Sequence, residues 1–109
     1  MRQYRSSLQI LADLLRAVGK GNRKTRIMYR ANLSFRLLSR YLDHALDVDL
    51  ISEMSENDGA YAVTSKGREF LEKYDRYASR HRQLRKQLRV VVEERTMLEK
   101  HYVQKMATS

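Results

Sequence analysis

The sequence contains no cysteine and no proline, and only four glycines among its 109 residues. Without cysteine, disulfides, thiolate catalysis and cysteine-ligated zinc are excluded, and a reducing compartment is the natural environment. Proline and glycine are the residues that disfavour helices most, so their scarcity favours helix. With Leu, Arg, Glu and Lys frequent, the composition predicts a mainly α-helical chain.

A long uncharged apolar run is also missing. The N-terminal residues lack the apolar stretch of a secretion signal, and no segment reaches the length needed to cross a bilayer. We therefore expect a soluble, cytoplasmic protein with no membrane partner.

Groups that carry catalysis or bind metals do not cluster in the sequence. His44, His81 and His101 are far apart and show no ligand spacing. There is no glycine-rich phosphate loop, and no nucleophile stands beside a base. We expect no enzymatic activity, no metal, no cofactor and no small-molecule ligand.

Positive charge is abundant and unevenly distributed. The net charge is +9, from 22 Lys and Arg against 13 Asp and Glu. Residues 1–40 carry a net +9, residues 41–64 carry −6 and residues 65–109 carry +6. A charge that served solubility alone would be spread more evenly, so this segregation favours a polyanion-binding face. A basic surface without a partner is the alternative.

Three helices and a hairpin are predicted in the first part of the chain. Apolar residues recur at three- and four-residue steps over 7–18, 24–30 and 35–46, which indicates amphipathic helices. Ser34 is a good N-cap for the third helix. Two short apolar runs, 50–54 and 60–64, flank a turn-forming cluster that ends in Asp-Gly, and this pattern predicts a β-hairpin.

From residue 65 the pattern is helical almost to the end. Large side chains recur at alternating steps of four and three from residue 70 to residue 102, an unbroken heptad seam of more than four heptads. A helix of about 40 residues is about 60 Å long, and one small domain cannot cover it, so we expect a second copy as its partner. The predicted dimerisation residues are Phe70, Tyr74, Tyr77, His81, Leu84, Leu88, Val91, Val92 and Leu98.

This order of elements is that of a winged helix-turn-helix domain, which we expect over 1–64, followed by a dimerisation helix over 65–109. In such domains the third helix enters the DNA major groove and the hairpin is the wing. The N-terminus of the second helix is a further phosphate site, because the helix dipole and free N–H groups favour anions there. The predicted DNA-contacting residues are Arg36, Arg40, Ser39, Phe35, Arg23, Lys24, Thr25, Arg26 and Asn57.

Further charge placements follow from this hypothesis. Arg2 and Arg5 are expected to add contacts to the DNA backbone, and the acidic stretch 41–64 is expected to face away from DNA except at the wing tip. The basic run from Arg76 to Arg89 contains no acid. It is either a second nucleic-acid contact or the solvated face of a coiled coil, and both interpretations stay open.

Several motifs resemble those of small archaeal DNA-binding proteins of the Sulfolobus 10a type. The resemblance is carried by the runs 24–29, 31–35 and 64–71, together with Tyr41 and Leu42. It implies an archaeal origin, duplex DNA as ligand, and a homodimer held by an antiparallel coiled coil. A chromatin-associated or a regulatory role is implied, and the protein is therefore expected at the nucleoid. The wing departs from this resemblance, because its acidic residues Glu56 and Asp58 disfavour a contact with phosphate.

A second hypothesis is a protein-interaction module, in which the winged helix binds another protein and the coiled coil is a scaffold. RNA binding through the basic run is a third. Whether the purified protein carries nucleic acid discriminates the first hypothesis from the second.

Overall fold

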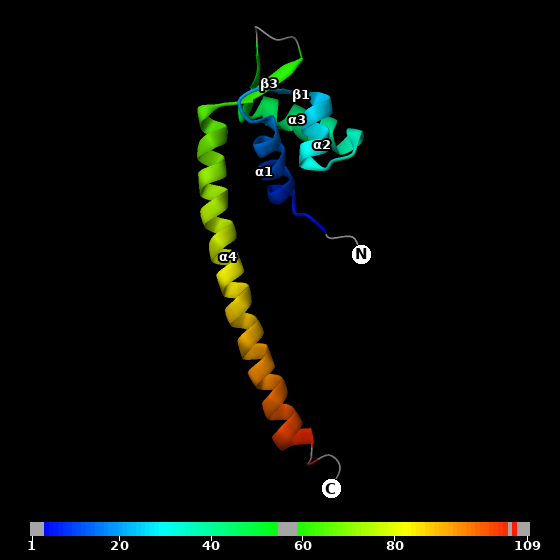
Figure 1. The fold of residues 1–109 in the computed structure, drawn as a ribbon. Coiled ribbons are helices and arrows are strands. Elements are labelled where there is room, and N and C mark those ends of the chain that lie inside the picture. Colours follow the sequence, from blue (N-terminus) through cyan, green and yellow to red (C-terminus); the bar gives the residue numbers. More distant parts are fainter. Residues whose placement is uncertain (1–3, 55–58, 105, 107–109) are drawn as a thin grey trace. The chain divides into compact units, whose positions relative to one another are not determined.

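The computed structural model describes residues 4–54, 59–104 and 106. Its chain falls into two compact units, Met1–Tyr74 and Asp75–Ser109. Figure 1 shows the fold, whose elements in chain order are α1 (Ser7–Val18), β1 (Asn22–Arg23), α2 (Lys24–Ala31), α3 (Phe35–Asp47), β2 (Ile51–Glu53), β3 (Ala60–Val63), α4 (Ser65–Leu98) and the π-helical turn η1 (Glu99–Val103).

The helices of the first unit begin and end where local chemistry dictates. Ser6 and Ser34 cap α1 and α3, and each hydroxyl accepts a hydrogen bond from the backbone N–H three residues later, at 3.1 and 3.2 Å. Asn32 ends α2 in the left-handed conformation, with φ 53° and ψ 55°, which an Asn tolerates better than most residues. These signals are local, so the predicted helix boundaries agree with the structure within one residue.

The sheet contains one strand more than the sequence predicts. β2 and β3 form the expected antiparallel hairpin, with Ile51 opposite Val63. The short strand β1 pairs with the other side of β3, with Arg23 opposite Ala60, so the order is β1-β3-β2. A two-residue strand is too short to show alternation in a sequence. Asn57, at the predicted wing tip, lies outside the described residues.

One hydrophobic core joins α1, α2, α3, the β2–β3 hairpin and the start of α4. α1 contributes Leu14, Leu15 and Val18, whereas its Leu8 is exposed, and the hairpin contributes Ile51 and Tyr61. Phe70 and Leu71 of α4 are partly buried against this core. Each large aliphatic side chain buried here stabilises the fold by about 1.5–3 kcal/mol. The largest fully buried side chains are Leu14, Leu15, Val18, Ile27, Leu38 and Leu42.

The second unit is helical, with a change of pitch near its end. α4 continues as an α-helix to Leu98, and the π-helical turn η1 follows. The Thr96 hydroxyl donates to the Val92 carbonyl at 2.9 Å just before this change, a bond that tends to bend helices. A π-turn shifts the phase of the side chains. The α-helical part of the predicted heptad seam therefore ends at Leu98, and Tyr102 lies within η1.

Gly67 is where α4 lies closest to the hairpin. A Cβ at this position would overlap the Leu50 carbonyl oxygen and the Val63 side chain. Helix propensity alone predicts that Gly67→Ala stabilises the helix by about 1 kcal/mol. We expect the opposite, a loss of about 1–3 kcal/mol in the free energy of unfolding, because the added methyl group must displace backbone.

Urea denaturation measures this effect. Ser65→Ala, at the exposed first residue of α4, is the control and should change the unfolding free energy by less than about 0.5 kcal/mol, the usual size for a surface substitution. A stabilised Gly67→Ala variant would contradict the close packing.

Candidate nucleic-acid interface

The outward face of α3 carries two arginines one turn apart. Leu38, Leu42 and Ala45 turn inward and are buried, which leaves Arg36 and Arg40 exposed on the other side. Helical geometry places these two guanidinium groups on one side of α3, and burial of the apolar stripe keeps that side in solvent.

The side chains next to these arginines add polar and apolar groups to the same face. Ser39 is half-buried, and Phe35 begins the helix with 67 % of its surface exposed. Asp43 also lies on this face, one turn beyond Arg40. It forms no hydrogen bond or ion pair with Arg40 in the described part of the chain. Asp43 is thus an acid of the stretch 41–64 that lies on the basic face of α3.

The N-terminus of α2 differs from those of α1 and α3 because no side chain caps it. Arg23 occupies the N-cap position without a capping hydrogen bond, and the first turn contains no acidic residue. Lys24, Thr25 and Arg26 form that turn and are exposed. Free backbone N–H groups and the positive end of the helix dipole meet basic side chains there, an arrangement that binds phosphate well.

The strand β1 ties this helix end to the wing. Because Arg23 pairs with Ala60, the N-terminus of α2 begins beside the strand that leaves the wing tip. Asn22 strengthens the connection, since its side-chain amide donates to the carbonyls of Ala17 and Val18 at 2.9 and 3.2 Å. Sequence reasoning missed this pairing, because two residues are too few to show the alternation of a strand.

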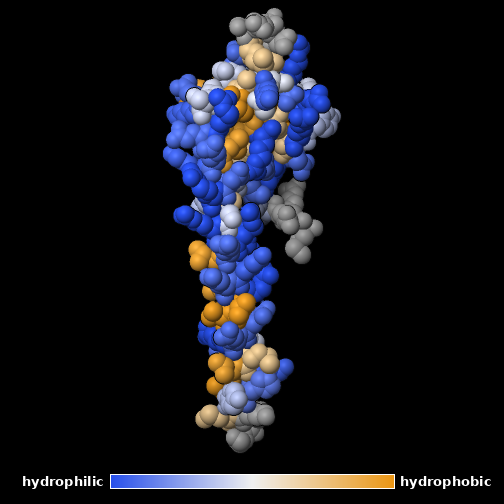
Figure 2. Space-filling model, turned by 60° about the vertical axis from the view of Figure 1, so that its left-hand side comes forward, coloured by the Kyte–Doolittle hydropathy of each residue, from blue (hydrophilic) through white to orange (hydrophobic). Residues whose placement is uncertain are grey.

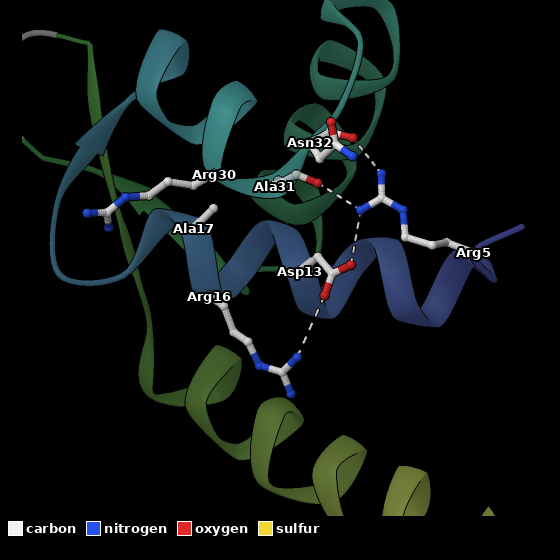
Figure 3. Close-up of a pocket in the computed structure, with 7 residues that line it drawn as sticks. All are labelled: Arg5, Asp13, Arg16, Ala17, Arg30, Ala31 and Asn32. Atoms are coloured by element: carbon white, nitrogen blue, oxygen red, sulfur yellow. Dashed lines mark hydrogen bonds and ion pairs between the residues drawn. The ribbon is translucent and has the colours of Figure 1, made fainter. Parts of the chain in front are cut away.

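Arg5 has a structural role, in contrast to its predicted contact with DNA. Its guanidinium donates to the carbonyls of Ala31 and Asn32 at 2.7 and 2.6 Å and pairs with Asp13 at 3.1 Å (Figure 3). It thereby satisfies carbonyls at the end of α2 that have no partner within the helix. Arg2 lies outside the described residues.

A pocket of about 410 Å³ surrounds this contact, between α1 and the end of α2. Asp13 also pairs with Arg16 at 3.7 Å, and the Arg16 guanidinium lies 5.7 Å from the centre of the Tyr74 ring. Figure 3 shows Arg30 pointing away from the other arginines. Two of the three arginines are thus held by the protein itself, and the pocket lacks a free cluster of charge.

The predicted dimerisation residues fall into two groups. Phe70 and Tyr74 belong to the first unit, where their rings stack with centroids 6.1 Å apart. The others belong to the second unit, and Tyr77 and His81 contact each other there with ring centroids 5.8 Å apart. Figure 2 shows hydrophobic patches along this helix, and the exposed seam residues are Tyr77, His81, Leu84, Leu88, Val91, Val92 and Leu98.

The described residues meet the requirements of neither a metal centre nor a membrane span. Among the described residues, no group of three or more His, Cys, Asp or Glu side chains is placed to hold a metal ion. No described helix combines the length and the apolar character that crossing a membrane requires.

The helix order, the connection between α2 and α3, and the three-stranded wing define a winged helix-turn-helix protein. The chain belongs to the winged helix-turn-helix family, which it matches over residues 4–82.

Among solved structures, the chain is similar to Sso10a-2, a DNA-binding protein from Sulfolobus solfataricus, with 26% identity and a TM-score of 0.76 over 82% of this chain and 95% of that one. The resemblance to the Sulfolobus 10a type is thereby confirmed.

Two uncharacterised proteins of Methanocaldococcus jannaschii are also similar. MJ0290 is 38% identical over 72 residues, which are 65% of this chain and 33% of that protein. MJ0287 is 36% identical over 56 residues, 50% of this chain and 58% of that protein. The chain therefore spans about a third of the first relative and just over half of the second.

Removal of Arg5 should weaken the fold. We expect Arg5→Ala to lower the free energy of unfolding by about 1–3 kcal/mol, the usual cost of leaving partly buried acceptors without their donor. Arg5→Lys should restore part of this loss, because one ammonium group cannot reproduce the forked geometry of a guanidinium. Chemical denaturation checks both, and equal stabilities of all three proteins would contradict the assigned role.

Proposed function

We propose that this protein is a homodimer that binds duplex DNA, reading bases through α3 and holding phosphates at the N-terminus of α2. The observation that carries the proposal is the uncapped N-terminus of α2 with its basic first turn, in the same compact unit as exposed Arg36 and Arg40. Similarity to Sso10a-2, a DNA-binding protein, supports it. Transcriptional regulation and chromatin architecture at the nucleoid both fit this activity. A genome-wide binding map distinguishes them, because a regulator occupies few sites and an architectural protein occupies many.

Each side chain on the outward face of α3 has a chemical role in this proposal. Arg36 and Arg40 pair bidentately with guanine or with phosphate, and the Ser39 hydroxyl contacts either. Phe35 packs against a thymine methyl group, an apolar contact available in the major groove. Asp43 accepts a hydrogen bond from a cytosine amino group and repels phosphate, so it favours discrimination over affinity.

Substitutions in α3 should weaken DNA binding more than a substitution elsewhere in the same unit. We expect Arg36→Ala and Arg40→Ala each to reduce duplex affinity about 5- to 150-fold, equivalent to about 1–3 kcal/mol. Arg16→Ala removes the same charge from α1, where the guanidinium is held by Asp13, and is the matched control. Fluorescence anisotropy with a labelled duplex, repeated at several salt concentrations, measures these affinities.

The log of the binding constant should fall linearly with the log of the salt concentration, because several phosphates are neutralised. Equal losses in all three variants would show that α3 is not the reading helix. A protein without duplex affinity at low salt would contradict DNA binding and leave the protein-interaction module.

The seam of α4 is the proposed dimer interface. Leu84, Leu88, Val91 and Leu98 each leave more than half of their surface exposed, at 64, 62, 58 and 59 %. Burial of such a side chain contributes about 1.5–3 kcal/mol. A second copy that covers the seam would therefore stabilise the dimer substantially. The heptad spacing matches a helix of the same kind, since a and d side chains of one helix pack between those of the other.

Charges beside the seam favour an antiparallel pair. Positions e and g flank the seam, and their charges set the orientation of the two helices. In a parallel, in-register pair, Arg80 would face Arg85 of the second copy, and Glu94 would face Glu99. Both contacts repel.

In an antiparallel pair whose seams overlap from Tyr74 to Leu98, Arg80 faces Glu94 of the second copy and Gln87 faces its own copy. Opposite charges then meet twice in each dimer, against a single repulsive contact, between Arg85 and its own copy. This arrangement aligns the whole α-helical seam, which is why we prefer it to shifted antiparallel alignments.

The lack of native cysteine allows a direct test of this orientation. Gln87→Cys should form a disulfide-linked dimer under mild oxidation, because the two copies of position 87 face each other. Leu84→Cys is the matched probe for a parallel pair, in which position 84 would face its own copy. Non-reducing electrophoresis measures both yields, and sedimentation gives the mass in solution. A higher yield for Leu84→Cys would reverse the orientation, and a monomer at micromolar concentration would remove the dimer.

A further inference from the structure

A stripe of four basic residues follows one face of α4 in the second unit. Arg82, Arg85, Lys86 and Arg89 are spaced so that helical geometry places them on a single face about 10 Å long. All four are exposed. Arg82, Lys86 and Arg89 lie across the helix from Leu84, Leu88 and Val91, so covering the seam leaves them in solvent, whereas Arg85 borders the seam.

The stripe is not neutralised by the chain itself. Nearer the two ends of α4, basic residues pair with acids one turn away, as in Lys73–Glu69 at 3.1 Å and Arg95–Glu99 at 2.9 Å. No ion pair involves a member of the stripe in the described part of the chain, and no acid lies between Asp75 and Glu93 in the sequence.

Such an arrangement works against helix stability. Within the stripe, four pairs of like charges stand three or four residues apart, and each pair repels across one turn. A few exchanges of arginine for glutamate would remove this repulsion, as the paired residues of the same helix illustrate. An external polyanion relieves it equally well, and in that case binding free energy compensates for the repulsion.

We propose that this stripe is a second DNA-binding surface, separate from the winged helix, which binds the phosphate backbone of duplex DNA without reading sequence. A duplex carries about one negative charge per 1.7 Å of its axis, so a cationic stripe of this length meets several phosphates. The stripe contains no aromatic side chain, and stacking platforms are what proteins use to hold single strands. Duplex backbone is therefore the ligand that the chemistry favours.

The proposed dimer strengthens this surface, and this step rests on the proposed function. In the antiparallel pair, position 85 of one helix faces position 85 of the other, so Arg85 meets its own copy at the centre. The two stripes then lie on the same side of the coiled coil and join there. The resulting surface is strongly cationic, and a bound phosphate relieves the repulsion between the two Arg85 side chains.

The test removes charge from the stripe and leaves the seam intact. We expect the double variant Arg82→Gln with Arg89→Gln to lose affinity for all duplexes alike, and the slope of log affinity against log salt to become shallower by about 0.9 for each phosphate that is no longer neutralised. The double variant Lys73→Gln with Lys100→Gln removes the same charge from the C-terminal helix outside the stripe and should bind as the unmodified protein does. Sedimentation verifies that both variants keep the same oligomeric state.

The outcomes separate this proposal from the proposed function. An unchanged salt slope in the Arg82 and Arg89 variant overturns the stripe, whatever the α3 variants do. A reduced slope there, with no effect of Arg36→Ala, keeps the stripe and overturns the reading role of α3. Equal losses of affinity in both double variants mean a general charge effect and overturn the stripe. The stripe is also overturned if the Arg82 and Arg89 variant loses affinity for duplex RNA but keeps its full affinity for duplex DNA.

Discussion

The hydrophobic core of the first unit determines which surfaces remain for binding. α1, α2, α3 and the hairpin all direct their apolar residues into one cluster around Leu14 and Leu42. Among the described residues, no polar or charged residue is buried, as the cost of desolvating a charge requires. Every described arginine and lysine therefore stays at the surface, and the rotation of α3 that buries Leu38 and Leu42 turns Arg36 and Arg40 outward.

The basic residues then divide by what holds them. Arg5 and Arg16 are engaged by Asp13 and support the junction of α1 and α2. In the described part of the chain, residues at the N-terminus of α2, on α3 and along the middle of α4 have no acidic partner of this kind. A guanidinium paired within the fold contributes to stability, while one left in solvent is available to a polyanion. The total charge of the chain does not tell a stabilising arginine from one that is available to a polyanion. The positions of the acidic residues do tell them apart.

Much of the fold was accessible from the sequence because its signals are short-range. Ser34 and the apolar period of α3 predict that helix without reference to the rest of the chain. The pairing of β1 with β3 was missed because Asn22 and Arg23 meet residues about 40 positions away along the chain. The internal role of Arg5 was missed for the same reason, since its partners Ala31 and Asn32 lie at the end of another helix. The π-helical turn η1 was missed because the heptad spacing of the sequence continues through it.

The sequence by itself determined the periodicities, the caps and the separation of charge, because each depends on residues within a few turns of one another. It thereby determined that α3 presents an arginine pair and that α4 carries an apolar stripe opposite a basic one. Only the tertiary structure decided that Arg5 is used internally, that the N-cap residue of α2 makes no capping hydrogen bond and lies beside the wing, and that α4 passes into a π-helical turn after Leu98. Those outcomes depend on which backbone groups find partners when distant segments pack together, and no local pattern encodes that competition.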